Sequence, residues 1–424
     1  MSEWKEYKLG DVLNVKHGFA FKGEFFSQVP TKDVLLSPGN FNIGGGFKSD
    51  KFKFYNGNYP ESYILKEDDV IVTMTDLSKE GDTLGYSAKI PSHQGIRYLH
   101  NQRLGLVELK DKSVNLNFIY WLLRTRKYQQ FIVSSATGTT VKHTSPTRIG
   151  EYSFFAPDLP TQTAIAEILS SLDDKIELNN NINKELEKLA QTLFKQWFIE
   201  FEFPDENGEP YQSSGGEMIE SELGMIPKDW EIGILDDILE VKGGTTPSTK
   251  DASFWDGIYH WTSPRDLSNL EFPLLIDTDK KITAKGLKKI SSGLLPKGTL
   301  LLSSRAPIGY LAITEIETAI NQGYIAINGK KEFSNIFILY WLKVNMHLVI
   351  ERANGSTFLE ISKTNFKQIN CIIPDSTILH QYINQANATF EVMRNNLLEN
   401  QELSTLRDTL LPKLISGELN VKDL

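Results

Sequence analysis

The sequence predicts an α+β fold: two similar α/β domains separated by two long antiparallel helices that form a coiled coil, with a pseudo-twofold internal repeat. Three observations predict it. They are a sequence repeat, strand-like runs broken by Gly, Asn and Pro inside each half, and a long apolar stripe that closes each half. The expected parts are a first domain at 1–156, a helix at 157–203, a linker at 204–229, a second domain at 230–375 and a helix at 376–424.

The repeat begins with segment 4–18, which returns as 230–244 at an offset of 226. Further matches follow in the same order: Asn101-Gln102 with Asn321-Gln322, Tyr120-Trp121-Leu122 with Tyr340-Trp341-Leu342, Gly138-Thr139-Thr140 with Gly355-Ser356-Thr357, and Thr192-Leu193-Phe194 with Thr409-Leu410-Leu411. The offset falls only from 226 to 217 along the chain, so the halves differ by small insertions of the kind that loops tolerate. Two similar halves with different loops suggest a molecule that contacts two similar but non-identical targets.

Each domain is expected to mix short strands with one clear helix. In the first half we expect strands at 70–74 and 104–109 and a helix over 116–133. In the second half we expect strands at 299–303 and 324–327 and a helix over 335–352. The shared positions Trp121 and Trp341 are assigned to the cores.

A stripe of mostly apolar residues spaced by three or four follows each domain, as in a coiled-coil seam. The positions are Ile165, Ile168, Leu172, Ile176, Asn179, Ile182, Leu186, Leu189, Leu193 and Trp197 in the first helix, and Ile383, Ala386, Phe390, Met393, Leu397, Leu403, Leu406, Leu410 and Leu414 in the second. Each stripe alone would face water, so we expect the helices to pack on each other. Antiparallel packing would send the domains to opposite ends, with the helices as a ruler. Asn179 and Asn396 are expected to fix register.

Composition excludes several classes of protein. The single cysteine, Cys371, rules out disulfide frameworks and thiolate zinc sites. No apolar run is long enough to span a bilayer, and the start lacks the apolar core of a secretory signal, so a cytoplasmic protein is expected. A net charge of −9 argues against a uniformly basic nucleic-acid binder but leaves room for a local basic face.

Searches for catalytic motifs find little. Neither Asn-Pro-Pro-Tyr nor Asp-Pro-Pro-Tyr, the amino-methyltransferase motifs, occurs in the sequence. The carboxylate pairs Asp68-Asp69 and Asp173-Asp174 are interpreted as solvated surface rather than a nuclease metal site. The histidines at 17, 93, 100 and 143 are scattered and more typical of surface residues than of ligands.

Three segments carry a resemblance to a known family. They are the central link from Pro204-Asp205-Glu206-Asn207-Gly208 through Ser213-Ser214-Gly215-Gly216 to Trp230, the helix end at 411–419, and the opening of the first helix at 157–166. The chain resembles the specificity subunit of a type I restriction-modification system over its whole length. The resemblance implies two target recognition domains, a bipartite DNA target with an unspecified gap, and methylation of an adenine at N6 in each half-site.

The resemblance also implies partners and cofactors. Two methylation subunits, which use S-adenosylmethionine, would assemble on this chain, and restriction subunits using ATP and Mg²⁺ would join them for cleavage. The chain itself would be non-catalytic and would need no cofactor or metal. Two rival interpretations remain open: a methyltransferase or nuclease with unfamiliar motifs, and a DNA-independent coiled-coil adaptor, which the charge of −9 favours.

Each recognition domain should present polar and basic loops to the major groove, where all four base pairs differ. In the first domain the best candidate segment is 137–148, which combines flexible backbone, hydroxyls and cations; the alternative is an ordinary turn. The candidate DNA-binding residues of this domain are Lys16, Lys22, Thr75, Lys79, Thr139, Thr140, Lys142, His143 and Arg148.

In the second domain, segment 242–250 could be mistaken for a phosphate-binding P-loop, but it lacks the Gly-Lys-Ser/Thr ending. We expect it to contact the DNA backbone instead. Arg265 and Arg305 lie among small polar residues and could contact guanine, or could pair with carboxylates of their own domain. The candidates are Lys242, Thr245, Thr246, Lys250, Arg265, Ser304, Arg305, Ser356, Thr357 and Lys363. The repeated Asn-Gln pair could contact adenine but is more typical of a structural turn.

Overall fold

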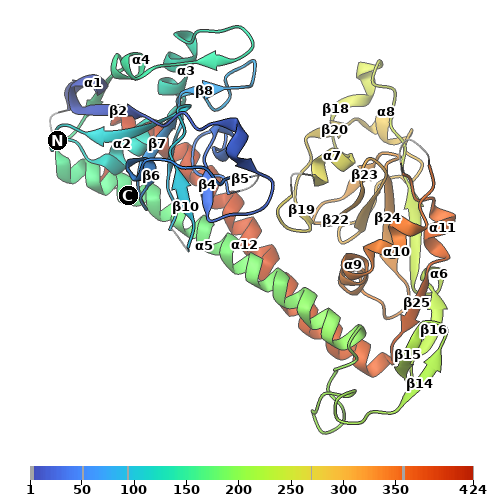
Figure 1. Ribbon diagram of the computed structural model, residues 1–424. Helices are drawn as coiled ribbons and strands as arrows, with labels where there is room; N and C mark the ends of the chain where they lie inside the picture. The colour runs from blue at the N-terminus through green and yellow to red at the C-terminus, as the bar shows by residue number, and fades with distance from the viewer. Residues whose placement is uncertain (1–3, 50–51, 93–94, 269, 356–358, 424) are drawn as a thin grey trace. The chain divides into compact units, whose positions relative to one another are not determined.

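The computed structural model describes residues 4–49, 52–92, 95–268, 270–355 and 359–423. The chain forms two compact units, one of Met1–Ile176 with Glu402–Leu424 and the other of Glu177–Gln401. Two long helices, α5 (Leu159–Phe198) and α12 (Ser376–Ser416), contribute to both units (Figure 1). Each unit therefore contains one α/β domain together with a stretch of each long helix.

The first unit contains two main sheets. One has the order β2-β11-β7-β9, with β2 (Leu13–His17), β11 (Leu104–Leu109), β7 (Val70–Thr73) and β9 (Ser87–Lys89). The other has the order β3-β5-β4-β10-β6, with β3 (Phe26–Ser27), β5 (Lys53–Tyr55), β4 (Asp33–Leu35), β10 (Arg97–Leu99) and β6 (Ile64–Leu65). Two strand pairs complete the unit: β1 (Lys5–Lys8) with β13 (Ser153–Ala156), and β8 (Thr75–Asp76) with β12 (Lys142–His143). Its short helices are α1 (Leu9–Val12), α2 (Leu116–Leu122), α3 (Arg126–Ser134) and α4 (Pro146–Gly150).

The second unit repeats this plan. Its main sheet has the order β17-β24-β21-β22-β19, with β17 (Leu239–Gly243), β24 (Tyr324–Gly329), β21 (Leu300–Ser304), β22 (Ile308–Thr314) and β19 (Leu274–Leu275). A second sheet has the order β20-β18-β23, with β20 (Lys280–Ile282), β18 (Trp255–Thr262) and β23 (Thr318–Ile320). Strand β16 (Glu231–Ile234) pairs with β25 (Asn370–Ile373), as β1 pairs with β13. The short helices are α6 (Leu235–Ile238), α7 (Pro264–Leu267), α8 (Ala284–Leu287), α9 (Asn335–Val344), α10 (Met346–Glu351) and α11 (Lys363–Lys367).

The predicted internal repeat is confirmed by this order of elements. The predicted strands at 70–74, 104–109, 299–303 and 324–327 correspond to β7, β11, β21 and β24. The helix expected over 116–133 is in fact two helices, because Thr125 ends the first segment and caps α3 by accepting a hydrogen bond from the Tyr128 amide. The helix expected over 335–352 is also divided, into α9 and α10, at Asn345, whose side chain donates to the Trp341 carbonyl of α9 and does not cap α10.

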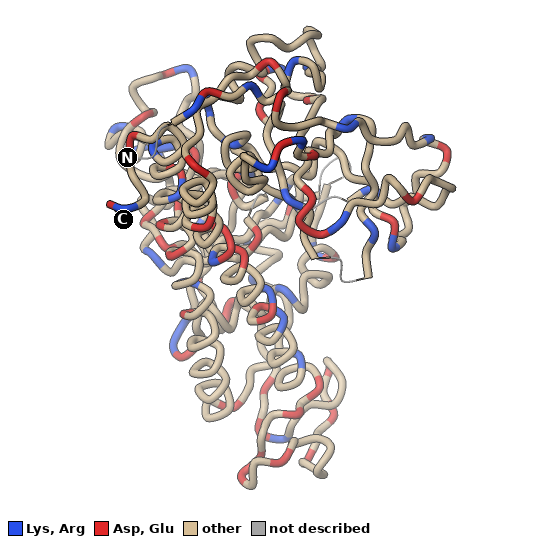
Figure 2. The backbone as a smooth tube through the Cα atoms, turned by 90° about the vertical axis from the view of Figure 1, so that its left-hand side faces the viewer, with Lys and Arg blue, Asp and Glu red and all other residues tan. Residues whose placement is uncertain are grey.

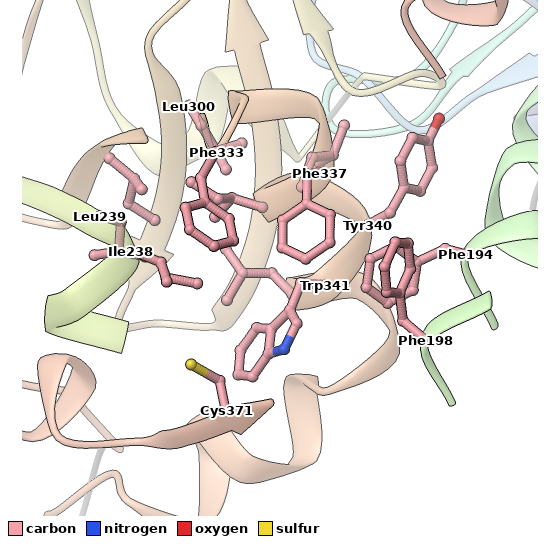
Figure 3. Packing of buried hydrophobic residues seen from close by; sticks show 14 of the residues in the cluster. Phe194, Phe198, Ile238, Leu239, Leu300, Phe333, Phe337, Tyr340, Trp341 and Cys371 are labelled. Carbon is pink, nitrogen blue, oxygen red and sulfur yellow. The ribbon is translucent and has the colours of Figure 1, made fainter. Parts of the chain in front are cut away.

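Aromatic side chains from α5 and α9 build the core of the second unit. Phe337 of α9 lies 5.5 Å from Phe194 and 5.1 Å from Phe198, between ring centroids (Figure 3). Trp341 and Cys371 belong to the same cluster, and burial raises the pKa of the Cys371 thiol to about 12, so the thiol stays protonated. Trp121 is fully buried in the first unit, where its indole donates to Ser170 Oγ of α5. Both tryptophans are core residues, as predicted.

The two long helices pack antiparallel. In the first unit, Asp173 of α5 pairs with Arg407 of α12 at 2.5 Å. In the second, Asn179 donates to Asn400 Oδ1 at 2.9 Å, and Asn396 donates to Asn183 Oδ1 at 2.8 Å. Residue numbers that rise along α5 meet numbers that fall along α12. Buried amide pairs of this kind favour one alignment over its neighbours, so the predicted register role of Asn179 and Asn396 agrees with the contacts.

Part of the predicted seam is wrong. Leu406 of α12 is predicted to lie on it but is 47% exposed, and Ile182 and Leu189 of α5, also predicted there, are 39% and 56% exposed. The buried positions around Ile182 and Leu189 are Asn183, Ala190 and Phe194. The buried face turns because this stretch of α5 packs against α9 as well as α12: Phe194 touches both Phe337 and Tyr382.

The segment predicted as a linker is folded onto the second unit. It contains a hairpin, β14 (Met218–Ser221) and β15 (Gly224–Pro227), and Phe203 stacks on Tyr211 and on Trp230 with centroid distances of 4.6 and 5.1 Å. Residues 200–231 hold ten of the 54 acidic residues but one of the 45 basic residues, and Asp and Glu predominate in this segment at the bottom of Figure 2. The rest of the chain therefore has no net charge, which removes the argument that a charge of −9 opposes DNA binding.

Candidate nucleic-acid interface

In the second unit, four strands, β17, β18, β21 and β23, end at one edge of the domain, which we call the strand-end edge. Strands β17 and β21 both run antiparallel to β24, so Gly243 and Ser303 lie beside its first residues, Ile325 and Tyr324. Strand β18 runs parallel to β23 and ends beside Ile320. The loops that follow these strands therefore meet, and they hold most of the second domain's predicted DNA-binding residues.

Hydrogen bonds connect the loops at this edge. Thr245 Oγ1 donates to the Lys289 carbonyl at 2.7 Å, and Thr246 Oγ1 donates to Gln322 Oε1 at 2.6 Å. A Cβ built on Gly243 would lie 3.1 Å from Lys363 Nζ, which places the start of α11 beside β17. These contacts bring Lys242, Thr245, Thr246 and Lys363 together. Among the described contacts, the hydroxyls of Thr245 and Thr246 hold this loop to its neighbouring loops.

The two arginines of this unit lie in different settings. Arg265 is exposed on α7, and within the described part of the chain no carboxylate lies in ion-pair range of it. Arg305 lies 3.7 Å from Glu360, so it has the intradomain partner considered above. Ser304 is buried, whereas Lys242, Lys250 and Lys363 are exposed. Ser356 and Thr357 lie outside the described residues.

A basic segment at this edge was missed by the sequence analysis. Residues 280–289 hold five lysines in ten positions, on β20, on α8 and directly after α8, and all five are exposed. Lys285 donates to Ser253 Oγ at 2.7 Å, which places α8 next to the loop after β17. A count of lysines along the chain would have found the segment. The segment has no counterpart in the first half, so the internal repeat does not indicate it.

The same edge exists in the first unit. Gly105 and Leu104, at the start of β11, lie beside His17 and Thr73, where β2 and β7 end. Strand β4 runs parallel to β10, and both end here. A Cβ on Gly18 would lie 2.2 Å from the Asn101 carbonyl, just as one on Gly244 would lie 2.0 Å from the Ile320 carbonyl. Only glycine allows this close approach of the two loops, so the same kind of contact shapes the edge in both units.

The candidates of the first unit gather around strands β8 and β12. His143 pairs with Thr75 across these strands, and Thr75 Oγ1 lies 3.2 Å from His143 Nδ1. Thr139, Thr140 and His143 are exposed and Lys142 is half-buried. Thr75 is buried, so it supports His143 rather than facing solvent.

Asp76 positions the loop that carries Lys79. Its carboxylate accepts hydrogen bonds from the Ser78 amide at 2.6 Å and from the Thr83 amide at 2.5 Å. Burial alone would raise the pKa of Asp76, but these hydrogen bonds outweigh burial and lower it, so the carboxylate stays ionised.

Three other candidates lie in separate settings. Lys16 lies 5.5 Å from the ring centroid of Tyr63, a cation–π contact. Lys22 lies 4.0 Å from Glu24, and Arg148, on α4, lies 3.2 Å from Glu151. Pairing with a carboxylate offsets the positive charge that a phosphate contact requires, so Lys22 and Arg148 are weaker candidates than the exposed residues at 139–143.

The repeated Asn-Gln pair forms a structural turn in both units. Asn101 Oδ1 accepts from the Arg103 amide at 3.0 Å, and Asn321 Oδ1 accepts from the Gly323 amide at 2.8 Å. A second repeated turn escaped the sequence comparison. Ser37-Pro38-Gly39-Asn40 and Ser263-Pro264-Arg265-Asp266 each form a capping box after the parallel strand.

Two expectations about polar residues are wrong. His100 is buried, not on the surface, and its Nε2 lies 3.0 Å from the Leu104 carbonyl oxygen. Asp173 is not solvated surface, because it pairs with the buried Arg124 as well as with Arg407. His17 and His143 are exposed as expected, and His93 lies outside the described residues.

No cluster of three or more possible metal ligands occurs within the described ranges. None of the described helices combines the length and apolar character that crossing a bilayer requires.

Comparisons with known proteins agree with the geometry. The family profile "Type I restriction modification DNA specificity domain" matches residues 1–188 and 227–400. The type I restriction enzyme HindI specificity subunit of Haemophilus influenzae is 26% identical over 485 residues, which cover 99% of this chain and all of that one. The EcoBI specificity subunit of Escherichia coli is 22% identical, over 99% of this chain and 87% of that one.

A solved structure shares the fold. The crystal structure of the type I restriction-modification S subunit from M. genitalium aligns with a TM-score of 0.57, at 16% identity, over 98% of this chain and 96% of that one. The family match decides against both rival interpretations, the independent enzyme and the DNA-independent adaptor. With the family profile matched in both halves, the chain belongs to the type I restriction-modification specificity family and is the non-catalytic DNA specificity subunit of such a system.

Proposed function

We propose that each unit binds one half-site of a bipartite DNA target through its strand-end edge, and that the paired helices fix the gap between half-sites. The observation that carries this proposal is the recurrence of one edge in both units. Its turns are held by equivalent residues, Gly18 and Asn101 in one unit and Gly244 and Asn321 in the other. The exposed side chains around these turns differ, as two different half-sites require.

Two methylation subunits are proposed to dock on the outer surface of the helix pair and to methylate an adenine at N6 in each half-site, with restriction subunits joining for cleavage. Leu178, Ile182 and Leu189 support this docking. They are 53%, 39% and 56% exposed, and their spacing of four and seven residues places them on one face of α5. A solvent-facing apolar stripe of this kind is typical of a protein interface.

The experiment that tests the proposal is sequencing of N6-methyladenine in cells that express this chain with its neighbouring methylation subunit. Cells with the methylation subunit alone are the control. We expect a two-part motif with a fixed gap, methylated on both strands, that disappears in the control. A motif without a gap, or one that persists without this chain, would contradict the proposal.

The docking surface is tested separately. Changing Leu178, Ile182 and Leu189 to Gln should prevent co-purification of the methylation subunit while the melting temperature stays unchanged, because all three side chains face solvent. The matched control changes Asn181, Lys188 and Gln191, exposed polar residues of the same helix, to Ala. Equal loss of binding in both triple variants would argue against an apolar docking stripe.

A further inference from the structure

One cross-strand pair of residues occupies the same place at the strand-end edge of both units. In the first unit it is Thr75 and His143, opposed on β8 and β12. In the second it is Arg305 and Glu360, which form an antiparallel bridge. Met74, which precedes Thr75, forms backbone hydrogen bonds with Arg103 and Thr144. Ser304, which precedes Arg305, forms the equivalent backbone hydrogen bonds with Gly323 and Ile361.

The surroundings of the pair are also equivalent. His143 forms an antiparallel bridge with Thr137, and Glu360 forms one with Asn354. The residue after each bridge partner, Gly138 in one unit and Gly355 in the other, has a positive φ. A serine, Ser145 or Ser362, then caps the short helix that follows. The described backbone around the pair is therefore equivalent in the two units, whereas the two side chains of the pair differ.

The chemistry of the two pairs differs in the way that base recognition requires. Arg305 and Glu360 are 36% and 50% exposed and lie 3.7 Å apart, so their charged ends reach solvent. An arginine that is paired with a carboxylate is poorly suited to contact a phosphate, because the carboxylate repels the phosphate. It is well suited to a base edge: arginine donates to guanine O6 and N7, and glutamate accepts from cytosine N4.

In the first unit the roles are distributed differently. His143 is exposed and Thr75 is buried beneath it, with Thr75 Oγ1 3.2 Å from His143 Nδ1. The threonine therefore orients the ring, and Nε2 remains available for a base or a phosphate. The exposed group comes from β12 in this unit, whereas the arginine of the second unit comes from the opposite strand.

We infer that this cross-strand position determines specificity in both units: Arg305, oriented by Glu360, recognises a G·C pair in the second half-site, and His143, oriented by Thr75, contacts one base pair in the first. The inference rests on the proposed function, because it assigns bases to a DNA target that the family membership alone does not specify.

The test transplants one pair onto the other unit. In the double variant Arg305→Thr with Glu360→His, N6-methyladenine sequencing should show one G·C position of the second half-site changed or relaxed, with the first half-site intact. A lost bidentate contact should reduce discrimination at that position roughly 5- to 150-fold. The matched control is Lys184→Thr with Glu271→His, which removes an ion pair of similar exposure in the same unit, 2.9 Å apart, between α5 and the loop after α7.

Several outcomes overturn the inference. An unchanged motif in the double variant, or a change in both half-sites, would show that the pair does not determine one base pair. If the double variant fails to fold, Arg305→Lys decides, since it keeps the charge and loses the bidentate geometry: a motif unchanged by Arg305→Lys would then refute the assignment. If the unaltered chain itself yields no two-part motif, the proposed function fails rather than this inference.

Discussion

The two units share their internal geometry and differ at their exposed edges. In both units an Asn side chain holds the turn before β11 or β24, and a glycine packs closely against that turn. Both units also bury a tryptophan at the same position of the helix that follows. At the strand ends, by contrast, His143 in one unit stands where Glu360 stands in the other. The comparison shows that the residues that shape the loops are the same in the two units, whereas the exposed residues that the loops carry differ.

The strongest way to break this comparison is to exchange a whole domain. Replacing residues 1–156 with the matching domain of a related specificity subunit should change the first half-site completely and leave the second half-site and the gap unchanged. The reason is that this domain and the second one have separate cores. Sequencing of methylated motifs measures all three features at once. A change in the second half-site would mean that the units do not act independently.

One carboxylate in each unit, Asp173 or Glu187, joins the helix pair to the domain, and the basic partners of these carboxylates differ in burial, so the cost of removing each carboxylate should differ. Asp173→Asn leaves Arg124, 5% exposed, without its carboxylate, and a buried charge left this way costs about 3–5 kcal/mol. Glu187→Gln in the second unit should cost less, because its partner Lys343 is 21% exposed and can turn to solvent. Denaturant unfolding, with hydrogen exchange to identify the unit, measures both.

The neighbouring Asp174 provides the control for Asp173. It is exposed on the same helix, so Asp174→Asn should shift the free energy of unfolding by less than about 0.5 kcal/mol. If Asp173→Asn cost no more than Asp174→Asn, the ion pairs with Arg124 and Arg407 would have no role in holding the helices.

The features that the sequence predicts correctly depend on local or periodic patterns, and the features that it does not predict depend on contacts between residues far apart in the sequence. The repeat, the paired helices and the Asn-Gln turn are local or periodic signals, and the sequence analysis found them. The seam at Ile182 and Leu189 was misplaced, because a stripe of period three to four does not show that α9 also packs on α5. Asp173 was misjudged because its partner Arg124 lies 49 residues away.

The candidate site was predicted in parts. Segments 137–148 and 242–250 were identified from flexible backbone, hydroxyls and cations, which are features of composition. That Thr75 opposes His143 across 68 residues, and Arg305 opposes Glu360, depends on strand pairing that no local pattern encodes. The lysines at 280–289 were visible in the sequence but had no repeated partner to draw attention to them.

A pH dependence should distinguish the two units. His100 is buried in the first unit, and burial lowers its pKa to about 4, whereas the unfolded chain should have a value near 6.5. Below pH 6.5 the unfolded state therefore binds the proton more readily, and stability falls as the pH falls towards 4. Between pH 7.5 and 5 the first unit should lose about 2 kcal/mol. The matching residue of the second unit is Ile320, which cannot titrate.

His100→Gln sharpens this prediction, since a glutamine amide can still donate to the Leu104 carbonyl but cannot bind a proton in this range. The difference between pH 7.5 and pH 5 in the free energy of unfolding of the first unit should then shrink by most of its value. An unchanged pH dependence in the variant would assign the effect to other groups.

The smallest expected effect concerns the lysines that only the second unit carries. Segment 263–299 has seven Lys or Arg and four Asp or Glu, whereas the corresponding segment 36–69 has four and five. Changing Lys281, Lys288 and Lys289 to Gln should weaken DNA binding by the assembled complex equally for target and non-target sequences, because phosphate contacts carry no sequence information. The slope of log K against log salt should fall by about 0.9 for each lysine that contacts a phosphate.

The control changes Lys66, Lys112 and Lys331, exposed residues at the opposite ends of the strands, and should leave the slope unaltered. A slope that falls equally in both triple variants would mean that the basic charge acts as a diffuse field over each domain. That result would contradict the proposal that the strand-end edge is the side that faces DNA.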